Sequence, residues 1–358
     1  MQLPEFRNEP LTDFARPENR AAMQEALAKV GALLGREYPL RIGGRAVHTD
    51  QKLRSIDPSR PDRVVGVHLA ADAGQAREAI EKAHQYFPQW SARPVEERAR
   101  VLVETARRIR DRKQEFSAWM VYEVGKTWPE ADADTAEAID FCEFYAREAL
   151  RLGGPQPLTP LAGERNELRY LPIGAGVIIP PWNFPLAIAA GMTTAALAAG
   201  NTVVLKPSSD SPTIAAQLVE TLLEAGCPAE AVSLLAGSGS AIGDALVTHP
   251  LTRFVAFTGS KQVGLRINEL AARPQTGQRW IKRVVAEMGG KDAIIVDSDC
   301  DLDKAVEGVL VSAFGYQGQK CSACSRAIVV DSVYEPFVNK LRERASRLAV
   351  GAAENPSN

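Results

Sequence analysis

Short apolar runs alternate with amphipathic stretches through the second half of the chain. The apolar runs cover Gly176–Ile179, Thr202–Leu205, Val232–Leu235, Phe254–Phe257, Val284–Val285 and Ala293–Val296. Helical patterns lie between them, at Pro212–Ala225, Ser240–Val247, Lys261–Ala271 and Leu302–Phe314. Strands of four or five apolar residues that alternate with helices are typical of a parallel sheet covered on both faces. We therefore predict an α/β fold built on a Rossmann-like parallel sheet.

The first half of the chain is mostly helical in pattern. Apolar positions recur at helical spacing over 72–87, 94–124 and 130–150. Residues 41–70 are predicted to form short extended pieces instead, with turns at Gly43-Gly44 and Asp57-Pro58. A connector over about 151–172 should end in an extended run at 167–172. The apolar stretch Leu186–Gly200 is shorter than the ~18 residues that span a bilayer and predicts a buried helix.

Composition excludes several classes of partner and site. The net charge is −2 over 358 residues and the charges are interspersed, which argues against nucleic acid or an anionic membrane as a partner. The N-terminus carries no signal-peptide core. The five cysteines do not form a disulfide framework in a chain of this length, and no spacing of possible ligands predicts a metal site. We expect a cytoplasmic protein with reduced thiols.

Segments with chemically reactive or ligand-binding residues follow the first five predicted strands. They are Pro180–Pro185 (PPWNFP), Lys206–Ser209 (KPSS), Gly237–Gly243, Thr258–Ser260 (TGS) and Glu287–Lys291 (EMGGK). Because ligands of such sheets bind beyond the carboxyl ends of the strands, we expect these segments to converge at one edge. The glycine-bearing segment does not match the G-x-G-x-x-G dinucleotide fingerprint, so alone it reads as an ordinary loop.

The segments PWNFP, KPSS, FTGS, EMGGK and GQKC, in this order, resemble the aldehyde dehydrogenase superfamily from about residue 40 to the end. FRNEPLTDF near the N-terminus and GQKCSACSR further resemble its pyrroline-5-carboxylate dehydrogenase branch, which oxidises glutamate semialdehyde to glutamate in proline catabolism. The resemblance implies an NAD(P)-binding domain within residues 1–286, with N-terminal helices. It implies the first part of an α/β catalytic domain over 287–358, a missing C-terminal part, and a homo-oligomer at full length.

Three residues match the catalytic positions of that family. Cys321 would add to the aldehyde, because a thiol is partly ionised at neutral pH and intrinsically nucleophilic. The side-chain amide of Asn183, with the backbone N–H of Cys321, would donate to the oxyanion that forms. Glu287 would act as the general base that activates water against the thioester. Each residue also has an ordinary structural reading: a buried thiol, a turn-holding amide and a surface acid.

The resemblance also implies a set of cofactor contacts, for NAD with NADP as an alternative. Lys206 would bond the ribose hydroxyls, and Ser260 would meet the pyrophosphate where a helix begins. Many NAD-preferring relatives have glutamate where this chain has Ser209, so less negative charge opposes a 2′-phosphate. The full set is Ile179, Pro181, Trp182, Lys206, Ser208, Ser209, Gly239, Gly243, Phe257, Thr258, Gly259, Ser260, Val263, Met288 and Gly289.

Three further residues match substrate contacts of the branch. Ser322 would bond the substrate carboxylate, Phe184 would pack on the methylene chain, and Glu137 would meet the ammonium group. Core packing for Phe184 and a plain helix surface for Glu137 are the competing interpretations. At the level of function, a broad-range aldehyde dehydrogenase and a non-catalytic protein on the same scaffold remain as alternatives. The charged end of the substrate separates the first alternative from the semialdehyde enzyme.

Overall fold

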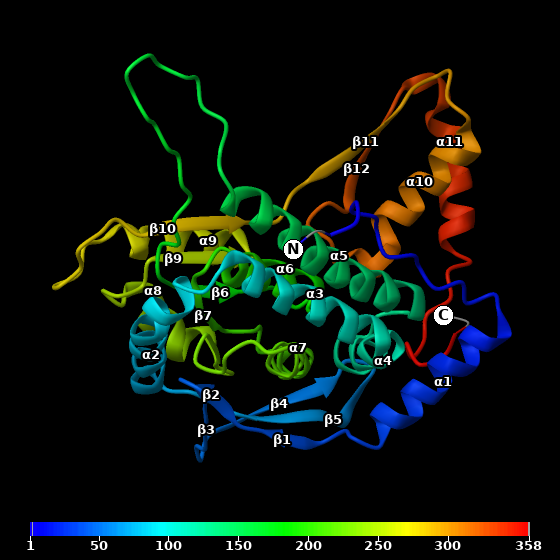
Figure 1. Cartoon of the computed structure of the whole chain (residues 1–358). Helices are drawn as coiled ribbons and strands as arrows, with labels where there is room; N and C mark the ends of the chain where they lie inside the picture. The colour runs from blue at the N-terminus through cyan, green and yellow to red at the C-terminus, as the bar shows by residue number, and fades with distance from the viewer. Residues whose placement is uncertain (2, 357–358) are drawn as a thin grey trace.

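A seven-stranded sheet lies at the centre of the computed structural model, which describes residues 1 and 3–356 (Figure 1). Its strands run in the order β10-β9-β6-β7-β8-β2-β3. The five parallel strands are β6 (Ala175–Ile179), β7 (Thr202–Leu205), β8 (Val232–Leu234), β9 (Phe254–Thr258) and β10 (Arg283–Glu287). Two antiparallel strands complete one edge, β2 (Leu40–Ile42) and β3 (Arg45–Val47). The predicted parallel sheet is confirmed.

Alternate residues of each central strand enter two different hydrophobic cores. Val177 and Val204 pack with helices on one face, whereas Ile178 and Val203 pack on the other. The first face is covered by α2 (Ala73–Ser91), α8 (Asp244–Thr248) and α9 (Lys261–Ala272). On the second face, α6 (Ala187–Ala198) and α7 (Pro212–Glu224) pack on the strands, and α3 (Val95–Asp111), α4 (Lys113–Val124) and α5 (Trp128–Gly153) pack on these two helices. Burial on both faces explains why the strand sequences are continuously apolar.

A smaller sheet lies beneath α7 in Figure 1, beside the N-terminal helix. Its order is β1-β5-β4, and the helix is α1 (Pro17–Gly31), which packs on α4. The strands are β1 (Arg36–Tyr38), β4 (Lys52–Asp57) and β5 (Arg60–Leu69). The turns predicted at Gly43-Gly44 and Asp57-Pro58 join β2 to β3 and β4 to β5. No helix of the described part of the chain is long and apolar enough to cross a membrane.

The helical pattern predicted over 94–124 is present, but it does not form one continuous helix. The segment forms two helices that meet at Arg112, whose φ of −117° and ψ of 27° depart from helical geometry. Lys113, the first residue of α4, is buried and its Nζ donates to the Pro10 carbonyl (2.8 Å) and to Asp132 (3.1 Å). These contacts with distant residues hold the start of the second helix, and helical periodicity alone does not predict them.

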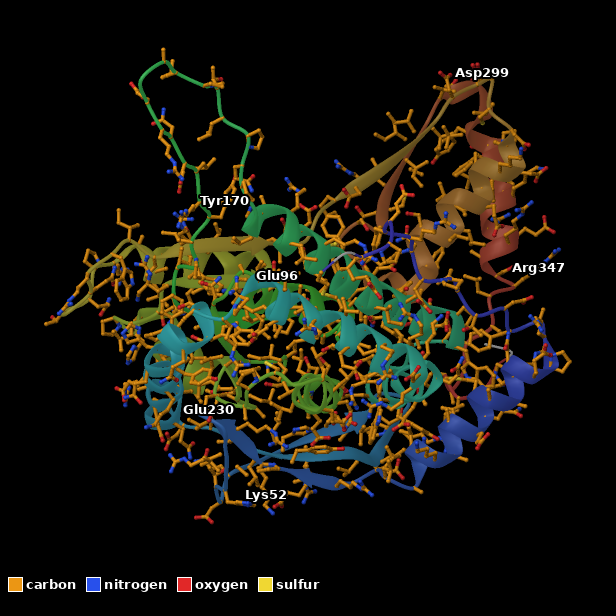
Figure 2. All side chains as sticks on the ribbon, in the orientation of Figure 1. Lys52, Glu96, Tyr170, Glu230, Asp299 and Arg347 are labelled. Atoms are coloured by element: carbon orange, nitrogen blue, oxygen red, sulfur yellow. The ribbon has the colours of Figure 1, made fainter. Side chains whose placement is uncertain are left out.

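The strand predicted at Ala293–Val296 forms, but it does not join the central sheet. It is β11 (Asp292–Val296), which pairs in parallel with β12 (Cys324–Val329) in a separate two-stranded sheet. Helices α10 (Leu302–Phe314) and α11 (Asp331–Ala345) pack on this pair around Phe337. Figure 2 shows Asp299 at the far end of this unit. The domain division at 286/287 stays a prediction, which this separate core favours.

The connector after α5 projects from the molecule (Figure 1). It forms no helix or strand between residues 154 and 174, and Tyr170 lies near its base in Figure 2. The extended run predicted at 167–172 therefore pairs with no strand in the described residues. Without a partner strand, an extended segment has no ladder of hydrogen bonds to make it a strand.

Candidate active site

A cleft of about 860 Å³ opens at the carboxyl edge of the central sheet. The chain order reverses at β6, because β7 and β8 follow on one side of it and β9 and β10 on the other. Such a reversal leaves a crevice beyond the strand ends. All fifteen residues predicted to contact a cofactor line this cleft, and so do Asn183 and Cys321. The convergence expected from the sequence is therefore present.

Lys206 supplies a buried positive charge to the cleft. The residue is 5% exposed, and its Nζ donates to the carbonyl of Pro207 at 3.1 Å. Burial lowers the pKa of Lys206 to about 8, an effect that the charge of Asp210 opposes. A buried ammonium without a close carboxylate partner is a donor available to polar groups of a ligand.

Helix starts and open backbone form a second part of the cleft lining. Ser260 caps α9, where its hydroxyl accepts from the Val263 N–H at 3.4 Å. A Cβ added at Gly239 or Gly243 would meet no atom within 4 Å, so both positions leave free space along the wall. The N–H groups and dipole of a helix N-terminus attract an anionic group, and backbone without side chains lets that group come close.

Cys321 lies exposed at the cleft, and segments from two other parts of the chain meet it. The Asn183 Nδ2 donates to the Gln319 carbonyl at 2.6 Å, two residues before the thiol. From the other side, the Gly290 N–H donates to the Cys321 carbonyl at 3.2 Å. A Cβ at Gly290 would lie 3.0 Å from that oxygen and 2.6 Å from Asp292 Oδ2, so a larger residue would crowd this contact. The thiol thus has the Asn183 amide nearby.

Glu287 is the last residue of β10 and pairs in register with Thr258. Its carbonyl accepts from the Gly259 N–H at 3.0 Å, which fixes the backbone where the strand ends. The Glu287 side chain is exposed and is not among the residues that line the cleft. The structure brings its segment to Cys321 through Gly290, three residues later.

None of the three predicted substrate residues lines the cleft. Phe184 is half-buried and stacks on Tyr316, with ring centroids 5.0 Å apart. Glu137 lies on α5 with its surface exposed, and desolvation by neighbouring groups and then the charges of Asp134 and Asp140 raise its pKa. Ser322 is exposed beside the thiol. Phe184 and Ser322 are each sequence neighbours of a residue at the cleft mouth, Asn183 and Cys321.

Sequence reasoning missed a group that packs behind the thiol, consisting of Lys126, Glu130 and Tyr316. Lys126 is 3% exposed, and its Nζ lies 3.9 Å from the centre of the Tyr316 ring. Glu130 accepts the N–H of Tyr316 at 2.5 Å. Only the spacing of Thr127 and Glu130, a capping box at the start of α5, was visible in the sequence. Tyr316, which Glu130 also contacts, is distant along the chain, so no local sequence pattern predicts that contact.

Comparison of the sequence with known protein families gives a match over most of the chain. The model of the aldehyde dehydrogenase family matches residues 46–358. The chain belongs to the aldehyde dehydrogenase family. It is 52% identical over 346 residues to a 1-pyrroline-5-carboxylate dehydrogenase of Geobacillus thermodenitrificans (strain NG80-2), covering 97% of this chain and 67% of that protein. The chain thus spans about two thirds of the length of this family member.

Two solved structures share the fold of this chain. A 1-pyrroline-5-carboxylate dehydrogenase from Thermus with bound NAD superimposes with a TM-score of 0.96 at 50% identity, over 99% of this chain and 69% of that one. An NADP-dependent enzyme of E. coli superimposes with a TM-score of 0.83 at 34% identity, over 91% and 66%. The predicted aldehyde dehydrogenase fold is confirmed.

Proposed function

We propose that this protein oxidises glutamate semialdehyde, which forms from 1-pyrroline-5-carboxylate, to glutamate in proline catabolism with NAD(P)⁺. The observation that carries the proposal is the meeting of Cys321, Asn183 and the Glu287–Gly290 segment at the mouth of the cleft. The Geobacillus and Thermus proteins, named as dehydrogenases of 1-pyrroline-5-carboxylate, support it.

The cleft fits a dinucleotide cofactor in size and in the chemistry of its walls. Its volume lies within the ~300–1,000 Å³ of small-molecule sites. Lys206 would hold ribose hydroxyls, the start of α9 at Ser260 would hold the pyrophosphate, and the space at Gly239 and Gly243 would admit the adenosine half. When bound, NAD(P)⁺ supplies the acceptor for the hydride that leaves the substrate carbon.

The first half of the reaction uses the thiol and its neighbouring donor. The Cys321 thiolate forms a C–S bond to the aldehyde carbon, and the carbonyl electron pair moves to oxygen. The Asn183 amide and the Cys321 N–H stabilise this oxyanion, and losing one such donor typically costs ~10²–10³ in rate. Departure of the hydride leaves a thioester on Cys321, and the aldehyde carbon has been oxidised by two electrons.

The second half needs a base and a water molecule. Glu287 takes a proton from water, whose oxygen attacks the thioester carbon. The C–S bond then breaks, the Cys321 thiolate leaves and the carboxylic acid is released. Glutamate semialdehyde carries an ammonium and a carboxylate, which Glu137 and Ser322 would recognise while Phe184 packs on the methylene chain. We further propose that the whole protein works as a homo-oligomer in the cytoplasm.

The selectivity for cofactor should change when charge is placed at Ser209. This residue lines the cleft, and its hydroxyl lies 3.4 Å from the Gly237 carbonyl. Ser209→Glu would put a carboxylate where a 2′-phosphate binds, and we expect NADP⁺ use to fall at least about tenfold relative to NAD⁺, the effect of about 1.4 kcal/mol of repulsion. The ratio of kcat/KM values for the two cofactors measures it, with Ser209→Gln as the uncharged control. An unchanged ratio would place the 2′ position elsewhere.

The substrate assignment is tested by NADH formation in the whole protein. We expect glutamate semialdehyde to give a kcat/KM at least about 100-fold above that of an unbranched alkanal of equal length, because two charged contacts of roughly 1.5–3 kcal/mol each are absent from the alkanal. Glu137→Gln should lower that preference without changing the rate with the alkanal. Equal use of both aldehydes would indicate the broad-range enzyme instead.

A further inference from the structure

The turn that leads into Cys321 holds two residues in an unfavourable backbone conformation. Tyr316 and Gln317 both have φ of 54° with ψ near 30°, within the 3₁₀ turn Gly315–Gly318. They are the only non-glycine residues at positive φ in the described chain. A side chain makes this left-handed region costly, so surrounding contacts must hold the turn in place.

The Glu130 carboxylate makes the contacts that hold this turn. Oε1 accepts the backbone N–H of Tyr316 at 2.5 Å, and Oε2 accepts the Gln317 side-chain amide at 3.0 Å. The Tyr316 hydroxyl in turn donates to the Glu130 carbonyl at 3.3 Å. Oε2 also accepts the Thr127 N–H at 3.1 Å, which anchors the carboxylate to the start of α5. Both residues at positive φ are therefore tied to a rigid helix end.

Lys126 holds the same turn from the side of the aromatic rings. Its buried Nζ lies 3.9 Å from the Tyr316 ring centre and 4.7 Å from that of Phe184, and the two rings stack on each other. Asp134, also buried, lies 3.5 Å from the ammonium. Burial lowers the pKa of Lys126, while Asp134 and Glu130 oppose that shift. The ammonium thus joins α5 to Phe184, the neighbour of Asn183.

The turn is connected through the next few residues to Asn183 and Cys321. Gln319 follows the turn, and its carbonyl accepts the Asn183 amide at 2.6 Å. Cys321 lies two residues further and is held by Gly290. A relaxation of Tyr316 and Gln317 to negative φ would redirect the backbone at Gln319, and with it the spacing between the thiol and the Asn183 donor.

We propose that Glu130 is a positioning residue for catalysis, which fixes the turn at Tyr316 and Gln317 and so aims Cys321 at the substrate. This inference rests on the proposed role of Cys321 as the nucleophile. Glu130 does not line the cleft. Its loss should therefore lower the rate of the chemical step and leave the binding of the cofactor intact.

The test is Glu130→Gln in the whole protein. The amide keeps the size of the side chain but has one acceptor oxygen for three donors. We expect kcat with glutamate semialdehyde to fall at least tenfold, while KM for the aldehyde and Kd for NAD⁺ stay within twofold. Glu143→Gln is the control, because it makes the same change on the same helix, where Glu143 forms ion pairs with Arg110 and Arg147 and with no other described residue. Equal kcat values for the two variants would overturn the proposal.

Exchanging the two polar partners tests the contact itself. Gln317→Glu alone sets one carboxylate against another and should also lower kcat. In the double variant Glu130→Gln, Gln317→Glu, an amide again faces a carboxylate, and we expect kcat to recover at least threefold over Glu130→Gln. If the fold-reduction in kcat of the double variant equals the product of the two single-variant reductions, the two side chains do not act together. This result would contradict the inference.

A third measurement separates this inference from the proposed function. Alkylation of Cys321 by iodoacetamide, followed by peptide mass spectrometry, needs no substrate. We expect it to be at least threefold slower in Glu130→Gln than in Glu143→Gln, because the thiol no longer faces the cleft opening in most molecules. Wild-type protein that cannot oxidise the semialdehyde would refute the proposed function alone, whereas equal alkylation rates would refute the positioning role.

Discussion

Cys321→Ser is expected to lower kcat by about 10³-fold or more while the affinity for NAD⁺ stays unchanged. A serine hydroxyl is not ionised at neutral pH, so it adds poorly to the aldehyde carbon. It is also a poorer leaving group than a thiolate, so the resulting ester hydrolyses slowly. The Asn183 amide would remain in place, because its bond runs to the backbone carbonyl of Gln319 and not to the thiol.

The measurement is steady-state NADH formation, together with the Kd for NAD⁺ from quenching of Trp182, which lines the cleft. Cys300→Ser is the matched control, since Cys300 is partly exposed but packs in the small core around Phe337. It should keep kcat within twofold. A Cys321→Ser protein with more than a tenth of the wild-type kcat would mean that the covalent step uses another residue.

Glu287→Gln is expected to separate the two halves of the reaction. The amide cannot take a proton from water, so steady-state turnover should fall by about 10²–10⁴. Formation of the thioester does not need this base, and the first turnover should remain within a few fold of wild type. The result is a burst of one reduced cofactor per Cys321, followed by a slow phase.

Stopped-flow absorbance detects the burst, and intact-protein mass spectrometry detects the acylated chain. Glu307→Gln provides a control on α10, where the carboxylate pairs with Arg344 and, among the described residues, does not line the cleft. It should leave both phases unchanged. If the burst slows as much as the steady state, Glu287 acts on the thiol or the hydride step, and the assignment of the hydrolytic base would be wrong.

Local patterns were sufficient to predict the five parallel strands of the sheet and the segments that line the cleft. Continuous apolar runs such as Thr202–Leu205 occur where both faces of a strand are buried, and the polar segments after them could be located by chain order alone. The role of each residue was harder to predict. Trp182 and Lys206 needed the family resemblance, because nothing in a single tryptophan or lysine specifies a ligand.

Features that depend on contacts between distant parts of the chain could not be predicted from the sequence. The apolar run Ala293–Val296 in β11 is as short and continuous as the run in β7, so pairing with β12 could not be distinguished from membership of the central sheet. The break at Arg112 arises from the contacts of Lys113 with Pro10 and Asp132. The sequence around Glu130 predicts a helix-capping residue. Its contacts with Tyr316 and Gln317 exist only in the folded chain.

The reversal of chain order at β6 has a kinetic consequence. The cleft is complete only after β9 has crossed back over the sheet and β10 has added at the outside, bringing Glu287 beside Thr258. Such parallel, non-local pairings close late in folding, because large loops must be ordered before they form. The catalytic groups should therefore be assembled among the last steps of folding, and a ligand held across both sides of β6 would selectively stabilise that final pairing.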